Sequence, residues 1–168
     1  AAFVGAWTEA TGVMVSGRPA ESRVEEGSVT AGVLHTSPTL GSTSAERFLA
    51  LSIAGARRTL FVTNSYFAPD AAFVGLLAQA AERGVDVRLL VGGRGTDVRV
   101  ARAAGRAHYG TLLAAGARMY EWEPSNLHAK TFVIDGLWCS IGTMNFDNRS
   151  LGLNDVVTLM VLVAEIGP

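Results

Sequence analysis

The strongest constraint on the fold of this chain is an alternation of strand-like and helix-like segments through its middle. Short runs rich in Val, Leu and Phe are separated by longer segments in which apolar residues recur at helical spacing. The strand-like runs cover residues 59–64, 85–92 and 117–122, and the helical segments cover about 43–56, 70–84 and 97–115. Strands that alternate with helices in this way predict βαβ units and a parallel sheet.

Local signals mark where several of these elements begin and end. Thr43 and Glu46 have the spacing of a capping box at the start of the first helix. Asp70 has the side chain and position expected of an N-cap for the second helix. Gly84 and Gly116 follow the second and third helices, where glycine commonly ends a helix.

The pattern changes after residue 122. Two strand-like runs, "LHAKTFVI" and "LWCSIG", are separated by Asp135-Gly136, a dipeptide that strongly favours a β-hairpin. Further strands are expected before Pro38 and at 156–163. We therefore predict an α/β fold with a mixed, mostly parallel sheet, flanked by helices, and with an antiparallel hairpin late in the sheet.

Composition narrows the possible functions. The chain has 168 residues, 49% of them hydrophobic, which is enough for a sizeable core. Its formal net charge of −1 does not favour a broad nucleic-acid-binding surface, and we expect no nucleic-acid partner. The single Cys139 excludes an intrachain disulfide. The longest apolar run, near 156–164, is too short to span a membrane.

The clearest chemical signal lies in "SNLHAKTFVIDG", residues 125–136. Lys130 is the only lysine, whereas the other thirteen basic side chains are arginines. If this run is a strand, His128 and Lys130 point the same way, about 7 Å apart. Thr143 and Asn145 share parity across the hairpin, so all four polar side chains converge where the strand ends.

Such a set suits the binding and attack of a phosphoryl group. Lys130 and Asn145 would bind non-bridging oxygens, and His128 would supply a nucleophilic nitrogen near neutral pH. We find no cluster of carboxylates to hold Mg²⁺, so we expect metal-free chemistry and no cofactor.

The longer pattern is His-x-Lys, four residues, Asp, six residues, then Gly-Thr-x-Asn. It resembles the signature of the phospholipase D superfamily, the HKD motif. The segments "NSYFAPDAAFVGLLAQAAERGVDVRLLVGG", "YGTLLAAGARMYEW" and "NFDNRSLGLN" are similar to parts of bacterial cardiolipin synthases. The opening "AWTEATG" resembles the tail of a preceding catalytic half. We therefore expect residues 1–16 to be a remnant of that half, 17–30 a linker, and 31–168 a C-terminal catalytic half of a longer protein.

The resemblance implies a mechanism and roles for matching residues. In the family, two such motifs meet; one histidine becomes a phosphohistidine and the other protonates the leaving alcohol. His128 matches one of these histidines, and Lys130 and Asn145 match the phosphate-binding pair. Thr143 stands where the family usually has serine. Asp135 matches the motif aspartate, although its place in a turn favours a structural role at least as strongly as a chemical one.

One position departs from the family pattern. The family usually has a glutamate after "RSL-x-x-N-x" that orients a catalytic histidine, and Val156 occupies that place here. Three interpretations follow: activity is reduced, Asp155 substitutes through a bulge, or the sequence contains an error. The choice among them stays open at this stage.

Other candidates have competing explanations. Tyr66 and Phe67 follow a strand end, where ligands tend to bind, so they are candidates for a substrate channel or for the core. Arg94 is a third candidate for the substrate channel. It precedes a helix face that carries three further arginines, which is a candidate site for phosphates or anionic lipid headgroups, or simply a solvated surface. These arginines are Arg99, Arg102 and Arg106.

The leading hypothesis is a phosphatidyltransferase or phospholipase D of the cardiolipin synthase type. Its expected partners are a phospholipid, a second HKD half and a membrane surface, on the cytoplasmic side of a bacterial inner membrane. One alternative is a nuclease-like phosphodiesterase in which two copies pair as a homodimer. Another is a catalytically impaired half that serves as a scaffold.

Overall fold

The computed structural model describes residues 2–14, 29–36, 44–147, 150–151 and 154–162. Thr43, the expected capping residue, lies outside these ranges, as do most of the expected linker and the end of the last expected strand. Among the described residues no helix is long and apolar enough to span a membrane.

The described strands form one mixed sheet and one small accessory pairing. The seven-stranded sheet has the order β1-β9-β7-β6-β2-β4-β5, and β3 pairs separately with β8. The strands are β1 Thr30–Thr36, β2 Thr59–Asn64, β3 Phe67–Ala68, β4 Asp86–Gly92, β5 Arg118–Trp122, β6 Lys130–Ile134, β7 Trp138–Gly142, β8 Phe146–Asp147 and β9 Val156–Leu162. The α/β class, the mixed sheet and the late hairpin are thus confirmed.

The parallel part of the sheet is smaller than the sequence pattern suggested. Within the described seven-stranded sheet, only the β2–β4 and β4–β5 pairings are parallel, whereas β1–β9, β9–β7, β7–β6 and β6–β2 are antiparallel. The βαβ units account for the parallel half. The antiparallel half arises because β6 and β7 form a hairpin beside β2, and β9 and β1 extend that arrangement.

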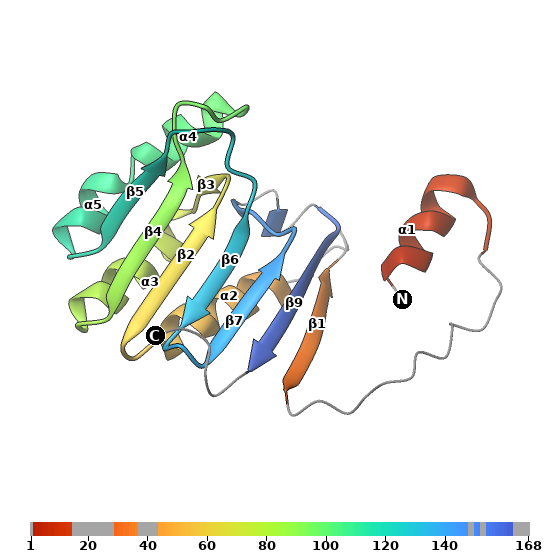
Figure 1. Cartoon of the computed structure of the whole chain (residues 1–168), viewed down its shortest axis with the longest axis horizontal. Coiled ribbons are helices and arrows are strands. Elements are labelled where there is room, and N and C mark those ends of the chain that lie inside the picture. The colour runs from red at the N-terminus through yellow and green to blue at the C-terminus, as the bar shows by residue number, and fades with distance from the viewer. Residues whose placement is uncertain (1, 15–28, 37–43, 148–149, 152–153, 163–168) are drawn as a thin grey trace.

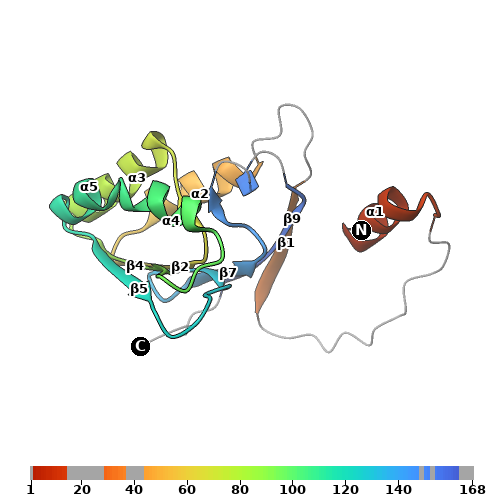
Figure 2. The ribbon, with the colours of Figure 1, turned by 90° about the horizontal axis from the view of Figure 1, so that it is seen from above.

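Four of the described helices pack against the sheet and contribute to the core. They are α2 Ser44–Gly55, α3 Ala71–Glu82, α4 Arg99–Arg106 and α5 Tyr109–Ala114. Helix α1, Ala2–Thr11, contributes no described residue to the core cluster. Helices α2 to α5 lie on one face of the sheet, as the view from above shows (Figure 2). Asp70 caps α3 as expected, because its carboxylate accepts a hydrogen bond of 2.9 Å from Phe73 N.

The single long helix expected over 97–115 is divided into α4 and α5. The break falls at Ala107 and His108, after Gly105. A side chain at Gly105 would collide with the backbone oxygen of Phe67, so the glycine allows α4 to lie directly on β3. The break therefore lets α4 reach across the end of the sheet while Leu112 of α5 stays in the core.

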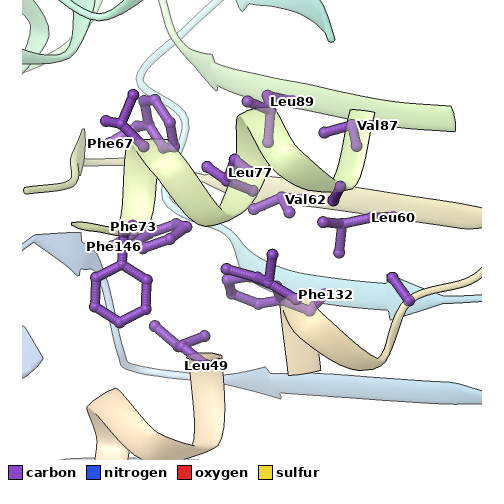
Figure 3. Close-up of a cluster of buried hydrophobic side chains, with 14 of the residues drawn as sticks. Leu49, Leu60, Val62, Phe67, Phe73, Leu77, Val87, Leu89, Phe132 and Phe146 are labelled. Atoms are coloured by element: carbon purple, nitrogen blue, oxygen red, sulfur yellow. The ribbon is translucent and has the colours of Figure 1, made fainter. Parts of the chain in front are cut away.

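The core lies between the helices and the covered face of the sheet (Figure 3). Phe146 is fully buried, and three other rings pack against it at centroid distances of 5.2 to 5.9 Å. They are Phe67, Phe73 and Phe132. This aromatic cluster fixes β8, and with it the loop that carries Asn145.

Candidate functional site

Segments far apart in the sequence meet at one edge of the main sheet. The ends of β2, β4 and β7 and the start of β6 lie at this edge, and α4 lies beside it (Figure 1). His128 comes two residues before β6, and Lys130 is the first residue of that strand. Asn145 lies between β7 and β8. The fold thus brings together the two ends of the sequence motif.

Lys130 is buried although it carries a charge. Lys130 is only 7% exposed. Its Nζ donates a hydrogen bond of 2.9 Å to the backbone oxygen of His128. Nζ also lies 5.7 Å from the centroid of the Tyr66 ring. Burial lowers the pKa of Lys130, although the charges of Asp97 and Asp147 act in the opposite direction.

No carboxylate of the described residues lies within 4.0 Å of the Lys130 ammonium group. A buried cation without a close counter-ion is costly, and an anionic ligand would relieve that cost. The arrangement therefore favours the binding of a phosphate oxygen at this position.

His128 is exposed and faces Tyr66. The two rings are 6.3 Å apart between centroids and meet edge to face. Tyr66 is itself held by a hydrogen bond of 2.8 Å from its hydroxyl group to Asp97. Among the described residues no carboxylate bonds to the imidazole of His128, so its nitrogens remain accessible to a ligand.

Two residues that the sequence analysis missed hold Asn145 in place. Ser65 Oγ donates to Asn145 Oδ1 at 2.9 Å. Asn64, fully buried, accepts from Phe146 N at 3.0 Å and donates to Met144 O at 3.4 Å. The available signal was a pair of polar residues that ends the apolar strand at 59–64, but it gave no indication of their partners.

Thr143 forms two hydrogen bonds with the neighbouring strand β9. Its Oγ1 accepts a hydrogen bond of 3.0 Å from Val157 N, and its own N–H donates to Val157 O at 2.9 Å. Thr143 also lies beyond the end of β7, so strand parity does not set its direction. Its hydroxyl keeps one proton to donate, so the predicted phosphate contact stays a prediction.

Asp135 is not brought together with His128 and Lys130. It lies at the other end of β6, in the hairpin turn, with a φ of 56°. Its carboxylate accepts hydrogen bonds from three backbone N–H groups, at 3.0, 2.7 and 2.8 Å. The donors are Arg57, Arg58 and Thr59. The structure thus places Asp135 in a structural contact away from His128 and Lys130, and a catalytic role for it stays a prediction.

Asp155 does not replace the glutamate that was expected to orient a catalytic histidine. Val156 is buried in the core, at 3% exposure. The side chain of Asp155 is 44% exposed and lies 3.8 Å from His35 Nε2. Its carboxylate therefore contacts the histidine of β1 rather than His128.

The remaining candidates separate into two groups. Tyr66 lies at the site, whereas Phe67 is 3% exposed and belongs to the core rather than to a substrate channel. Arg94 lines a cavity of about 630 Å³ together with residues of α4.

In the part of the chain that the structure describes, no group of three or more His, Cys, Asp or Glu could hold a metal ion.

Comparison with known proteins decides the family. Residues 49–166 match the family model described as "Cardiolipin synthase, PLD-like domain". The chain belongs to this family. It contains the PLD-like domain, and the matched region includes residues 128–145.

Relatives and solved structures agree with this assignment. The PLD-like domain is 33% identical, over 92% of its chain, to cardiolipin synthase A of Yersinia pseudotuberculosis and of Yersinia pestis. It spans 32% of the length of those relatives.

The fold is shared with Nuc, a phospholipase D family member from Salmonella typhimurium. The TM-score is 0.65 at 20% identity, with 80% of this chain and 84% of the other covered. It is also shared with phosphatidylserine synthase from Haemophilus influenzae, with a TM-score of 0.64 at 14% identity, covering 81% and 35% of the two chains. These similarities concern the fold alone.

Proposed function

We propose that the PLD-like domain is one catalytic half of a phosphatidyltransferase of the cardiolipin synthase type, acting at a bacterial membrane surface. Its substrate would be a phospholipid phosphodiester, and its acceptor a glycerol-like alcohol. The observation that carries the proposal is the accessible imidazole of His128 beside the buried Lys130, which has no carboxylate within salt-bridge distance among the described residues.

The first chemical step forms a phosphohistidine. One imidazole nitrogen of His128 attacks phosphorus, and the bond from phosphorus to the alcohol oxygen of the headgroup breaks. The departing oxygen takes a proton from a second histidine, which belongs to the other half. Lys130 and the Asn145 amide bind the non-bridging oxygens, where negative charge lies in the transition state.

The second step releases the product. An acceptor alcohol gives its proton to the second histidine while its oxygen attacks phosphorus. The phosphorus–nitrogen bond breaks, and His128 is regenerated. With water in place of the alcohol, the same step would be hydrolysis and would yield phosphatidic acid.

A phosphodiesterase built from two copies of this chain is the second candidate. One observation favours it: the chain covers 84% of Nuc, so a protein of this fold exists at this size. Against it stand the 33% identity to cardiolipin synthase A and a net charge of only −1.

The test uses the full-length protein that contains this domain, in mixed micelles with phosphatidylglycerol. We expect cardiolipin and free glycerol to form in equal amounts. His128→Ala should abolish both, and acid-labile phosphate should be trapped only on the protein that keeps His128.

His108→Ala is the matched control, because this histidine lies between α4 and α5 and its side chain makes no capping hydrogen bond. It should retain activity. Undiminished product from His128→Ala would overturn the proposal, and hydrolysis of oligonucleotides without lipid transfer would favour the second candidate.

A further inference from the structure

A cavity with four arginines adjoins the candidate site. Its volume is about 630 Å³, and it is formed by the loop after β4 and one face of α4. We call it the arginine cavity; its lining residues are Arg94, Thr96, Arg99, Arg102, Ala103 and Arg106. By its sequence alone, this arginine face is compatible with a phosphate site or with a solvated surface.

One carboxylate organises two of these arginines. Glu121 of β5 contacts Arg102 at 2.7 Å and Arg106 at 2.6 Å, and it accepts a hydrogen bond of 3.2 Å from the Tyr109 hydroxyl group. Burial raises the pKa of Glu121, but the hydrogen bonds from the two guanidinium groups lower it overall, so the carboxylate stays ionised. The Glu121 carboxylate thus holds the guanidinium groups of Arg102 and Arg106 in place.

The other two arginines keep their charges available. Within the described ranges, neither Arg94 nor Arg99 has a salt bridge. In addition, Arg102 Nε is buried and has no hydrogen-bond partner in that part of the chain. An unsatisfied donor beside two guanidinium groups that have no salt bridge in the described ranges favours the binding of an anion.

The arginine cavity is linked to the candidate site through Asp97 and Tyr66. Asp97, next to the lining residue Thr96, accepts the hydrogen bond from Tyr66. The ring of Tyr66 in turn faces both His128 and Lys130. A ligand that occupies both places therefore needs two anionic groups joined by a linker that passes Tyr66.

We propose that the arginine cavity binds the second phosphate of a lipid that carries two phosphodiester groups, while Lys130 and Asn145 bind the reacting phosphate. The inference rests on the proposed function, because a transferase that joins two phosphatidyl groups through glycerol makes such a lipid. Guanidinium groups suit this role because their planar fork binds two phosphate oxygens at once. A polynucleotide fits less well, because a long backbone calls for a basic stripe, and the chain as a whole is slightly acidic.

The experiment compares ligands with one and two phosphates on the full-length protein. Calorimetry would measure the affinity for glycerol 1,3-bisphosphate, glycerol 3-phosphate, inorganic phosphate and a short single-stranded DNA. We expect the bisphosphate to bind about tenfold more tightly than glycerol 3-phosphate, the effect of one additional charge-assisted contact. Arg94→Gln and Arg99→Gln should each reduce this preference and leave the affinity for glycerol 3-phosphate unchanged.

Arg47→Gln is the matched control, because Arg47 is exposed on α2 and lines no part of the cavity. It should keep the full preference. Equal affinity for one and two phosphates, or an unchanged preference in both cavity variants, would overturn the inference. So would inorganic phosphate or DNA that binds as tightly as the bisphosphate and loses affinity in the same variants.

The binding measurement does not depend on turnover. Preference for the bisphosphate without lipid transfer would contradict the proposed function alone. Lipid transfer without that preference would contradict the second-phosphate subsite alone.

Discussion

Lys130 shows how one side chain connects sequence, burial and chemistry. It is the only lysine in a chain with thirteen arginines, and it is also the cation buried at the candidate site. The space it occupies lies between the ring of Tyr66 and the backbone oxygen of His128. An ammonium group is compact, whereas a guanidinium group is a broad planar fork. A lysine therefore fits where an arginine would crowd the imidazole of His128.

The lowered pKa of Lys130 predicts how stability changes with pH. Burial lowers the pKa below its ordinary value of 10.5, so the folded state binds fewer protons than the unfolded state between the two values. The cost of the buried charge is fully present below the folded pKa and is relieved as the pH rises through it. Relative to Lys130→Met, the wild type should gain stability with rising pH, by at most about 1.4 kcal/mol per pH unit.

Urea unfolding of both proteins across the alkaline range measures this difference. The tyrosines and arginines are common to the two proteins, so their titration cancels in the comparison. If the free energy of unfolding of the wild type instead fell relative to that of Lys130→Met as the pH rose, the folded protein would stabilise the ammonium group, contrary to the prediction from its burial.

At the scale of elements, local patterns predicted more than long-range contacts. The alternating strands and helices, the Asp135-Gly136 hairpin and the Asp70 cap all follow from neighbouring residues, and the structure contains them. The division of α4 from α5 depends on contact between Gly105 and Phe67, which are distant in sequence. The periodicity of apolar residues along the sequence does not predict such a contact.

The same distinction applies to the candidate site. His128 and Lys130 were found because their spacing is local. Asn64 and Ser65 were missed because they act on residues 144–146, about 80 positions away. The two-residue β3–β8 pairing that joins these regions is too short to leave a pattern of its own.

The hairpin and the turn before β2 form one unit, which predicts the role of Asp135. Its carboxylate joins the β6–β7 turn to the backbone at 57–59. Asp135→Ala leaves those three N–H groups without this partner and places alanine at a φ of 56°. We expect a loss of about 3 kcal/mol in the free energy of unfolding. The activity of the folded full-length protein should be unchanged.

Asp155→Ala is the matched control for this change. Asp155 is more exposed, and its only described ion pair is the 3.8 Å contact with His35, so its removal should change stability by about 0.5 kcal/mol or less. Chemical denaturation and initial rates of lipid transfer, measured on the same samples, separate the two effects. A large fall in activity at full stability for Asp135→Ala would restore the catalytic role expected from the motif.

At the scale of the whole molecule, the described histidines account for only one of the two that the proposed chemistry needs. His35 is on β1, three strands from β6, which corresponds to about 14 Å across the sheet. His108 lies in the helical layer between α4 and α5. Neither is placed beside His128. The proton for the leaving alcohol must then come from another half or another copy of this one.

We therefore expect transfer activity to depend on whether one catalytic half or both halves are present. The chain of 168 residues alone should bind glycerol 3-phosphate through Lys130 and Asn145 but should transfer no phosphatidyl group above the level of its His128→Ala variant. The full-length protein should transfer at a rate proportional to protein concentration, because both halves belong to one molecule. If two copies of this chain formed the site instead, the isolated chain would be active, and its rate at low concentration would rise with the square of concentration. Initial rates over a hundredfold dilution series of both proteins therefore distinguish the two arrangements, and activity of the isolated chain would contradict the two-half assignment.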